Sequence, residues 1–261
     1  MRKITLTALL IAVGMLMVST AAFAAITAAP GTGIKGSAHD LSFATGQGLA
    51  WGVAGLDPLD RICIFCHAPH HAYKLGDPGA LDYYPLWNHA VAAGPWTGYS
   101  NTDPAAPVVP GEIKHQLNAG VDGQILGQPG GVSKMCLSCH DGTLAVAQYG
   151  FAPSSSIGSS TGPRATPASR IFIGGGAAML TNHHPIGFDY GAVIAAGDTE
   201  IRGTGSPLIG SSRGMTIDMV LWGGKVECTS CHDVHNTQND GLKLLWVEDT
   251  GSALCFSCHA K

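Results

Sequence analysis

Charged residues are scarce in this chain, and this scarcity excludes several classes of protein. Asp, Glu, Lys and Arg make up 12% of the 261 residues, against a usual share of about 25%. The 14 Lys and Arg residues are outnumbered by 18 Asp and Glu residues. No basic cluster is present to neutralise phosphates, which excludes a nucleic-acid-binding protein. The hydrophobic share of 45% excludes a disordered chain.

Long apolar runs are absent after the N-terminal region. The one such run, at residues 4–18, follows a basic pair and is shorter than the roughly 20 residues that span a bilayer. The letters AFA at residues 22–24 fit the small-x-small rule for signal cleavage. We therefore expect a signal peptide at 1–24 and an exported chain at 25–261 with no membrane span. An uncleaved membrane anchor is the alternative.

Regular secondary structure is expected to be limited. The 36 glycines and 15 prolines amount to about a fifth of the chain, above the norm of about 12%, and favour turns over long helices. Residues 150–176 are rich in Gly, Ser and Pro and indicate a loop or hairpin. Apolar stretches at 171–173, 219–222 and 244–247 are expected to be strands or packing segments. The sequence predicts one loop-rich domain over 25–261, with few short helices and minor β-hairpins.

No cysteine lies outside one repeated pattern, C-x-x-C-H. The four copies contain the cysteine pairs Cys63 and Cys66, Cys136 and Cys139, Cys228 and Cys231, and Cys255 and Cys258. Disulfides or a tetrahedral zinc site would account for paired cysteines, but neither requires a histidine after every pair. Histidine makes up only 12 of 261 residues, so this placement is not accidental. The pattern predicts covalent attachment of four c-type haems.

The spacing of the motif suits haem attachment. A helical turn brings positions i, i+3 and i+4 to one side, so two thiols can join the vinyl groups of a porphyrin while the histidine binds its iron. The predicted proximal ligands are His67, His140, His232 and His259. The exported chain leaves about 60 residues per haem, too few for four separate domains. We expect a multihaem cytochrome c whose core is built around four covalent haems.

Eight histidines remain to fill four distal positions: His39, His70, His71, His89, His115, His183, His184 and His235. His70 and His235 each follow a proximal histidine by three residues, which directs them toward an adjacent haem. His184 precedes a proline that fixes the backbone, and His39 precedes an aspartate able to hold its other ring nitrogen. These four are the predicted distal ligands, with His89 in reserve. The alternative for each is an ordinary surface histidine.

Methionine is the competing distal ligand, but only four remain after signal cleavage, and Met135 is too close to Cys136 to reach its haem. Four bis-histidine haems of low potential are therefore expected. A six-coordinate iron leaves no open position for a substrate. The sequence favours an electron carrier over an enzyme such as a multihaem reductase, or over a structural protein whose haems act only as staples.

The order of the motifs resembles that of tetrahaem cytochromes with doubled haem motifs. The matching segments are residues 37–42 (SAHDLS), 66–70 (CHAPH), 85–88 (PLWN), 136–143 (CLSCHDGT), 184–186 (HPI), 231–236 (CHDVHN) and 255–261 (CFSCHAK). Within this group the chain is similar to the OmcE-type extracellular cytochromes of metal-reducing bacteria. The resemblance implies a filament subunit at the cell surface or beyond it. Its donors would be other multihaem cytochromes, and its acceptor a mineral, an electrode or another cell surface.

The N-terminal arm is the predicted contact between subunits. His39 follows a glycine-rich segment at 31–36, and fourteen extended residues span up to about 48 Å. We expect His39 to complete a terminal haem of the neighbouring subunit, in a head-to-tail contact that builds a filament. The alternative is that His39 binds the first haem of its own chain and that the protein is a periplasmic monomeric shuttle.

Overall fold

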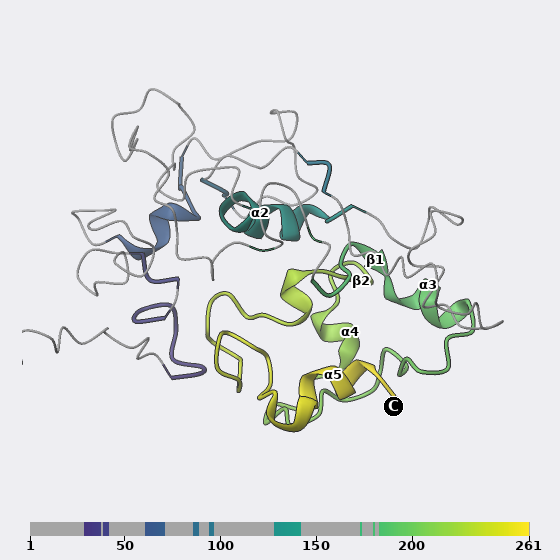
Figure 1. Ribbon diagram of the computed structural model, residues 1–261. Coiled ribbons are helices and arrows are strands. Elements are labelled where there is room, and N and C mark those ends of the chain that lie inside the picture. Colours follow the sequence, from purple (N-terminus) through teal and green to yellow (C-terminus); the bar gives the residue numbers. More distant parts are fainter. Residues whose placement is uncertain are drawn as a thin grey trace, which may run out of the picture.

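The computed structural model describes residues 29–37, 39–41, 61–70, 86–88, 94–96, 128–141, 173, 180 and 183–260. Within these ranges the regular elements are short and joined by turns (Figure 1). The helices are η2 (Ile62–Phe65), α2 (Gly131–His140), α3 (Tyr190–Ala195), α4 (Ile217–Val220), η4 (Cys228–Ser230), η5 (Thr250–Ser252) and α5 (Ala253–Cys258), and the strands are β1 (Phe188–Asp189) and β2 (Lys225–Val226). The prediction of a loop-rich fold with few short helices is confirmed for these residues.

Every C-x-x-C-H motif is built on a helical turn. The motifs lie on η2, on the C-terminal half of α2, on η4 and on α5. In three motifs the N–H of the histidine donates to the carbonyl of the first cysteine. The donors are His67 (2.8 Å), His232 (3.2 Å) and His259 (2.9 Å). This i to i+4 hydrogen bond brings the two cysteines and the histidine to the same side of the chain, as the spacing predicts.

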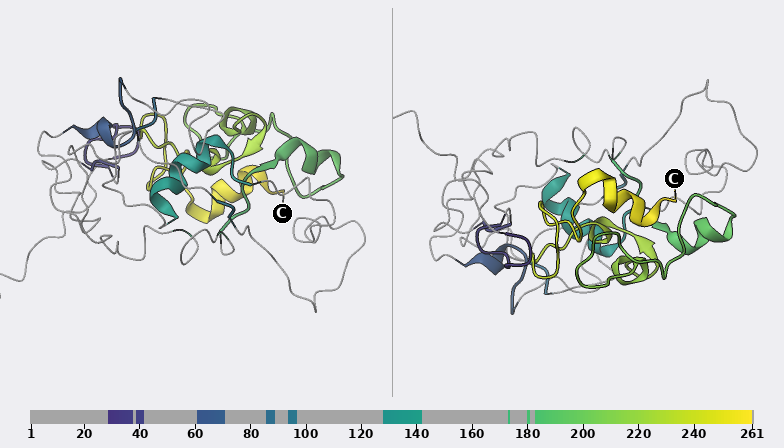
Figure 2. Two further views of the ribbon diagram at one scale, coloured as in Figure 1. Left: turned by 90° about the horizontal axis from the view of Figure 1, so that it is seen from above. Right: turned by 90° about the horizontal axis from the view of Figure 1, so that it is seen from below.

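The small sheet connects the region after residue 183 to the third motif. β1 and β2 are antiparallel, with Phe188 opposite Val226 and Asp189 opposite Lys225. Asp189 also caps α3, because its carboxylate accepts from the backbone N–H of Ala192 over 2.8 Å. β2 leads directly into η4, which packs against α2 (Figures 1 and 2).

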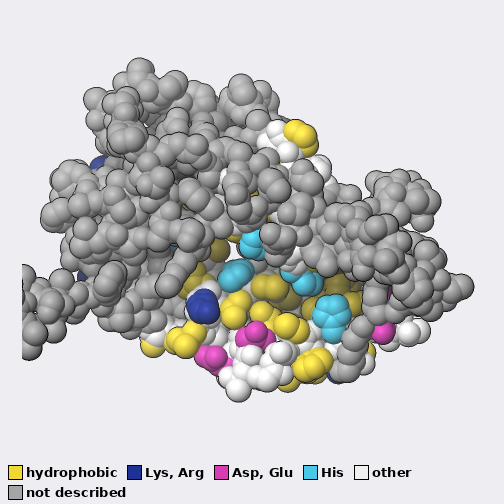
Figure 3. Space-filling view, in the orientation of Figure 1, with side chains coloured by type: hydrophobic (Ala, Val, Ile, Leu, Met, Phe, Trp, Pro, Cys, Tyr) yellow, Lys and Arg dark blue, Asp and Glu magenta, His cyan; other side chains and the backbone are white. Residues whose placement is uncertain are grey.

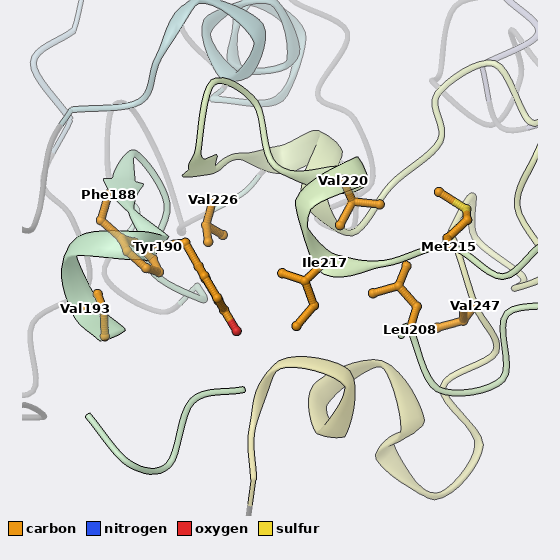
Figure 4. Packing of buried hydrophobic residues seen from close by; sticks show 9 residues of the cluster. All are labelled: Phe188, Tyr190, Val193, Leu208, Met215, Ile217, Val220, Val226 and Val247. Atoms are coloured by element: carbon orange, nitrogen blue, oxygen red, sulfur yellow. The ribbon is translucent and has the colours of Figure 1, made fainter. Parts of the chain in front are cut away.

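The main hydrophobic core supports the C-terminal motifs. Figure 4 shows its nine buried members, with Ile217 of α4 between Tyr190 and Leu208. Leu254 and Cys258 of α5 pack against this cluster. The apolar stretch at 219–222, predicted to be a strand or packing segment, contains the last residues of α4 and does not form a strand. The stretch at 244–247 is irregular, and its Leu244 and Val247 are buried.

The N-terminal segment at 29–37 docks on the loop that follows the third motif. The side-chain amide of Asn236 donates to the carbonyls of Ala29 (3.1 Å) and Gly33 (2.8 Å). Its oxygen accepts from the N–H of Gly31 over 3.2 Å, and its carbonyl accepts from Gly33 over 2.7 Å. Asn236 is 2% exposed, so this contact is internal to the fold.

Several predictions from the sequence fall outside the described residues. They concern the signal peptide at 1–24, the loop at 150–176 except residue 173, the reserve ligand His89, and the histidines His71 and His115. Among the helices that the structure does describe, none is long and apolar enough to cross a bilayer.

Candidate functional site

The first three C-x-x-C-H motifs are neighbours in space, in the same order as along the chain. Burial, together with the nearby Cys139 and Cys63, raises the pKa of the Cys66 thiol to about 12. The neighbouring thiols of Cys136 and Cys228 raise the pKa of Cys136 and lower that of Cys228, and the N–H of Cys228 donates to Ser133 Oγ of α2 over 2.9 Å. The first motif therefore lies beside the second, and the second is in contact with the third.

The fourth motif continues this order. Burial raises the pKa of Cys231 to about 12, and the neighbouring Cys258 is the next largest cause. All eight cysteines lie in described residues, and none is in a disulfide. Each pair is therefore available for thioether bonds to a porphyrin.

Three proximal histidines each face a second imidazole. His67 and His235 are stacked, with ring centroids 6.2 Å apart and planes 13° apart. The other two pairs are closer to perpendicular: His140 and His39 at 6.1 Å and 65°, and His259 and His184 at 6.2 Å and 66°.

These separations suit an iron atom between the two rings. A metal lies about 2 Å from a bound imidazole nitrogen, and that nitrogen lies about 1 Å from the ring centroid, so two opposite ligands have centroids about 6 Å apart. Figure 3, drawn in the orientation of Figure 1, shows histidine side chains among hydrophobic ones in a hollow of the face toward the viewer. The donor set and its spacing therefore fit the iron of a haem. The assignment of His39, His184 and His235 as distal ligands stays a prediction.

His232 is held by a strained turn. Its Nδ1 donates to the carbonyl of Lys243 over 3.2 Å, which leaves Nε2 available for a metal. Lys243 and the following Leu244 have φ values of 59° and 62°, in the left-handed region. Among the residues that the structure describes, no second ring faces His232 as in the other three pairs. His70 is exposed and is not brought against a described proximal histidine, so its role also stays a prediction.

His39 lies inside its own chain rather than at the end of a free arm. Burial, together with the neighbouring His140, lowers its pKa to about 4, so the ring is neutral at pH 7. The ring donates to the carbonyl of Val234, whereas Asp40 accepts from the N–H of Gly36. The structure therefore places the ring of His39 beside that of His140 in its own chain, and residues 29–37 dock on Asn236 nearby. The binding of His39 to a haem of a neighbouring subunit stays a prediction.

Backbone pairing fixes three proximal histidines. His67, His232 and His259 each form an antiparallel bridge with a distant residue, and the partners are Trp87, Leu245 and Ile201 respectively. Sequence reasoning missed these contacts because isolated bridges leave no periodic pattern. They tie the backbone of each of these histidines to a segment outside its own motif.

Two buried aspartates were also missed. Asp141 and Asp233 directly follow proximal histidines. Asp141 accepts from Trp96 Nε1 over 3.2 Å, and Asp233 accepts from the N–H groups of His235, Thr237 and Gln238. The repeated letters C-H-D at the second and third motifs were the available signal. Asp233 orients the loop that carries His235.

The comparison with known families concerns the C-terminal part of the chain. A family described as the doubled CXXCH motif matches residues 222–261, which contain the third and fourth motifs. No curated protein matches the chain. CXXCH motifs are attachment sites for haem, and the helical turns and histidine pairs described above suit that role. The chain therefore has the covalent haem-binding motifs of a c-type cytochrome.

Proposed function

We propose that this chain is an electron-transfer protein that carries electrons along four bis-histidine c-type haems. The observation that carries the proposal is the set of three histidine pairs with centroids 6.1 to 6.2 Å apart, each containing one motif histidine. When bound, the haem iron supplies reversible one-electron chemistry.

The protein supplies ligands, orientation and exclusion of water. The cysteine pairs fix each porphyrin edge, and the motif histidines are the proximal ligands. We assign His235 as the partner of His67, His39 as the partner of His140, and His184 as the partner of His259. His70 is left for His232. Two imidazoles held to each iron would leave no position for a substrate, which favours a carrier over a reductase.

The order of the motifs supports a continuous path. The first motif lies near the second, the second contacts the third, and the third lies near the fourth. Neighbouring attachment points keep the bound groups close without any movement of the chain. We infer that electrons pass in the order of the motifs, in either direction.

The site of action is proposed from the resemblance to extracellular cytochromes. In this proposal the exported chain polymerises into a filament, receives electrons from other multihaem cytochromes, and passes them to a mineral, an electrode or a cell surface. A periplasmic monomeric shuttle is the second candidate, and the position of His39 inside its own chain favours it.

Intact-mass spectrometry of the exported protein tests the haem content. We expect the mass of residues 25–261 plus four haems, because four motifs use all eight cysteines. Any other number of haems contradicts the proposal.

Electron microscopy and sedimentation of the same sample then separate the two candidates: ordered fibres support the filament, and a single monomeric species supports the shuttle.

A further inference from the structure

A buried carboxylate lies where the second and third motifs meet. Glu227 is 1% exposed and directly precedes Cys228, the first residue of η4. Its Oε1 accepts a hydrogen bond of 3.0 Å from the N–H of Gly130, the residue before α2. Its Oε2 accepts a short hydrogen bond from the hydroxyl of Ser133 in the first turn of α2. One side chain therefore joins the start of α2 to the start of η4.

Backbone groups complete the same network. The N–H of Cys228 donates to Ser133 Oγ over 2.9 Å, and the N–H of Glu227 donates to Ser230 Oγ over 2.9 Å. Ser133 lies one turn before Cys136, the first attachment cysteine of the second motif. The network therefore holds together the two turns that carry adjacent haem attachment points.

The contact is shaped for an acid. A Cβ at Gly130 would lie 2.5 Å from Glu227 Oε1, so this position has no room for a side chain while the carboxylate is in place. Burial raises the pKa of Glu227, whereas Ser133, Gly130, Lys225 and Lys134 lower it. Burying a carboxylate is costly unless hydrogen bonds compensate, and an apolar contact would join two helices at a lower cost. The acid instead provides two acceptors in fixed directions.

We propose that Glu227 is a positioning residue that fixes the second and third haem motifs relative to each other and thereby sets the electronic coupling between their haems. This inference rests on the proposed electron-transfer function. Because α2 and η4 pack against each other and each carries an attachment cysteine, a small rotation of α2 against η4 would change the distance between the two haems. A displacement of a fraction of an ångström is enough to take functional groups out of their working geometry.

Paired variants of the haem-loaded protein test this role. Glu227→Gln replaces one carboxylate acceptor with a donor, and Gly130→Ala displaces the unchanged acid from the other side. Glu248→Gln is the control for the acid, because Glu248 is exposed and accepts only from the N–H of Leu242 in the described contacts. Gly203→Ala is the control for the glycine, because a Cβ there meets nothing within 4 Å.

The readout is circular dichroism of the Soret band, in which closely spaced haems give a split signal. We expect both test variants to carry four haems by intact mass and to lose at least about half of the split amplitude, while both controls match the wild type. A wild-type split signal in both test variants overturns the inference. Should Glu227→Gln fail to accumulate, Gly130→Ala decides the outcome alone. A wild type that lacks four reversibly reducible haems overturns the proposed function itself.

Discussion

Single hydrogen bonds place several ligands at this site. Asp233 holds the N–H of His235 over 3.1 Å, and the Lys243 carbonyl holds His232 over 3.2 Å. The contact at the ring nitrogen of His232 fixes the orientation of that ring and raises its basicity, whereas the contact of His235 fixes its backbone. The motif histidines could be singled out as candidate ligands from the sequence because haem attachment needs a histidine at a fixed offset from the cysteines. Their hydrogen-bond partners could not, since a carbonyl such as that of Lys243 is present in every residue.

His184 offers a direct test of one distal ligand. Replacing it with Ala should leave four covalent haems but open one iron, since its ring lies opposite that of His259. We expect a high-spin species that binds carbon monoxide, measured by optical spectroscopy. His183→Ala is the matched control and should remain low-spin. A His184→Ala protein that is fully low-spin and inert to carbon monoxide would show that another residue, with His89 the first candidate, holds the position.

The buried acid predicts a pH dependence of stability. Burial raises the pKa of Glu227 above its ordinary 4.5, so the folded chain holds this proton more tightly than the unfolded chain. The stabilisation is complete below 4.5 and is lost as the pH rises through the raised pKa. Glu227→Gln cannot ionise and should not lose it. The guanidinium midpoint of the wild type should therefore fall relative to that of the variant as the pH rises. A difference independent of pH would contradict this account.

At the scale of elements, the motif turns were predictable and their packing partners were not. The i, i+3, i+4 spacing predicted the helical turns now seen in η2, α2, η4 and α5. The two-residue strands β1 and β2 are too short to give an alternating pattern. The apolar residues at 219–222 were expected as a strand or packing segment and end a four-residue helix instead. Burial against the hydrophobic core determines the conformation of these short segments, and local secondary-structure propensity does not.

The turn that holds His232 contains a residue suited to relief of strain. Lys243 is exposed and has a φ of 59°, a conformation that costs an L-residue about 1 to 2 kcal/mol and costs glycine little. Lys243→Gly should therefore raise the free energy of unfolding by about 0.5 to 1 kcal/mol after the entropy of glycine is deducted. Lys243→Ala, which keeps a Cβ, should give no gain. Equal stability of the two variants in guanidinium titrations would argue against strain at this turn.

At the scale of the whole molecule, the four motifs form a sequence-ordered series joined by close cysteines. The gaps between motifs along the chain are unequal, so the spacing did not predict that the motifs follow one another in space in this order. The length of the N-terminal arm predicts a contact of His39 with a neighbouring subunit, which stays a prediction, whereas within the chain the contacts of Asn236 with residues 29–33 accompany a contact of His39 with His140. Side-chain hydrogen bonds between segments more than 200 residues apart are not visible in a sequence.

His39 distinguishes a ligand within the chain from one between chains. His39→Ala should open the iron of the second motif even in dilute monomeric protein, because its ring lies opposite that of His140. We expect a high-spin fraction of about one haem in four, measured by electron paramagnetic resonance. Mixing with wild-type protein should not remove it. A variant that is low-spin as a monomer, or that regains low-spin haem from added wild type, would place the histidine between subunits instead.

Reductive titration of the purified, oxidised protein is the most direct test of the central claim that four bis-histidine haems form one electron-transfer chain. Optical spectra at an electrode report electron uptake and spin state together. The account predicts reversible uptake of four electrons per chain, low-spin spectra throughout, and no reaction of the reduced protein with carbon monoxide. Uptake of fewer than four electrons, or a high-spin haem that binds carbon monoxide in the wild type, would contradict it.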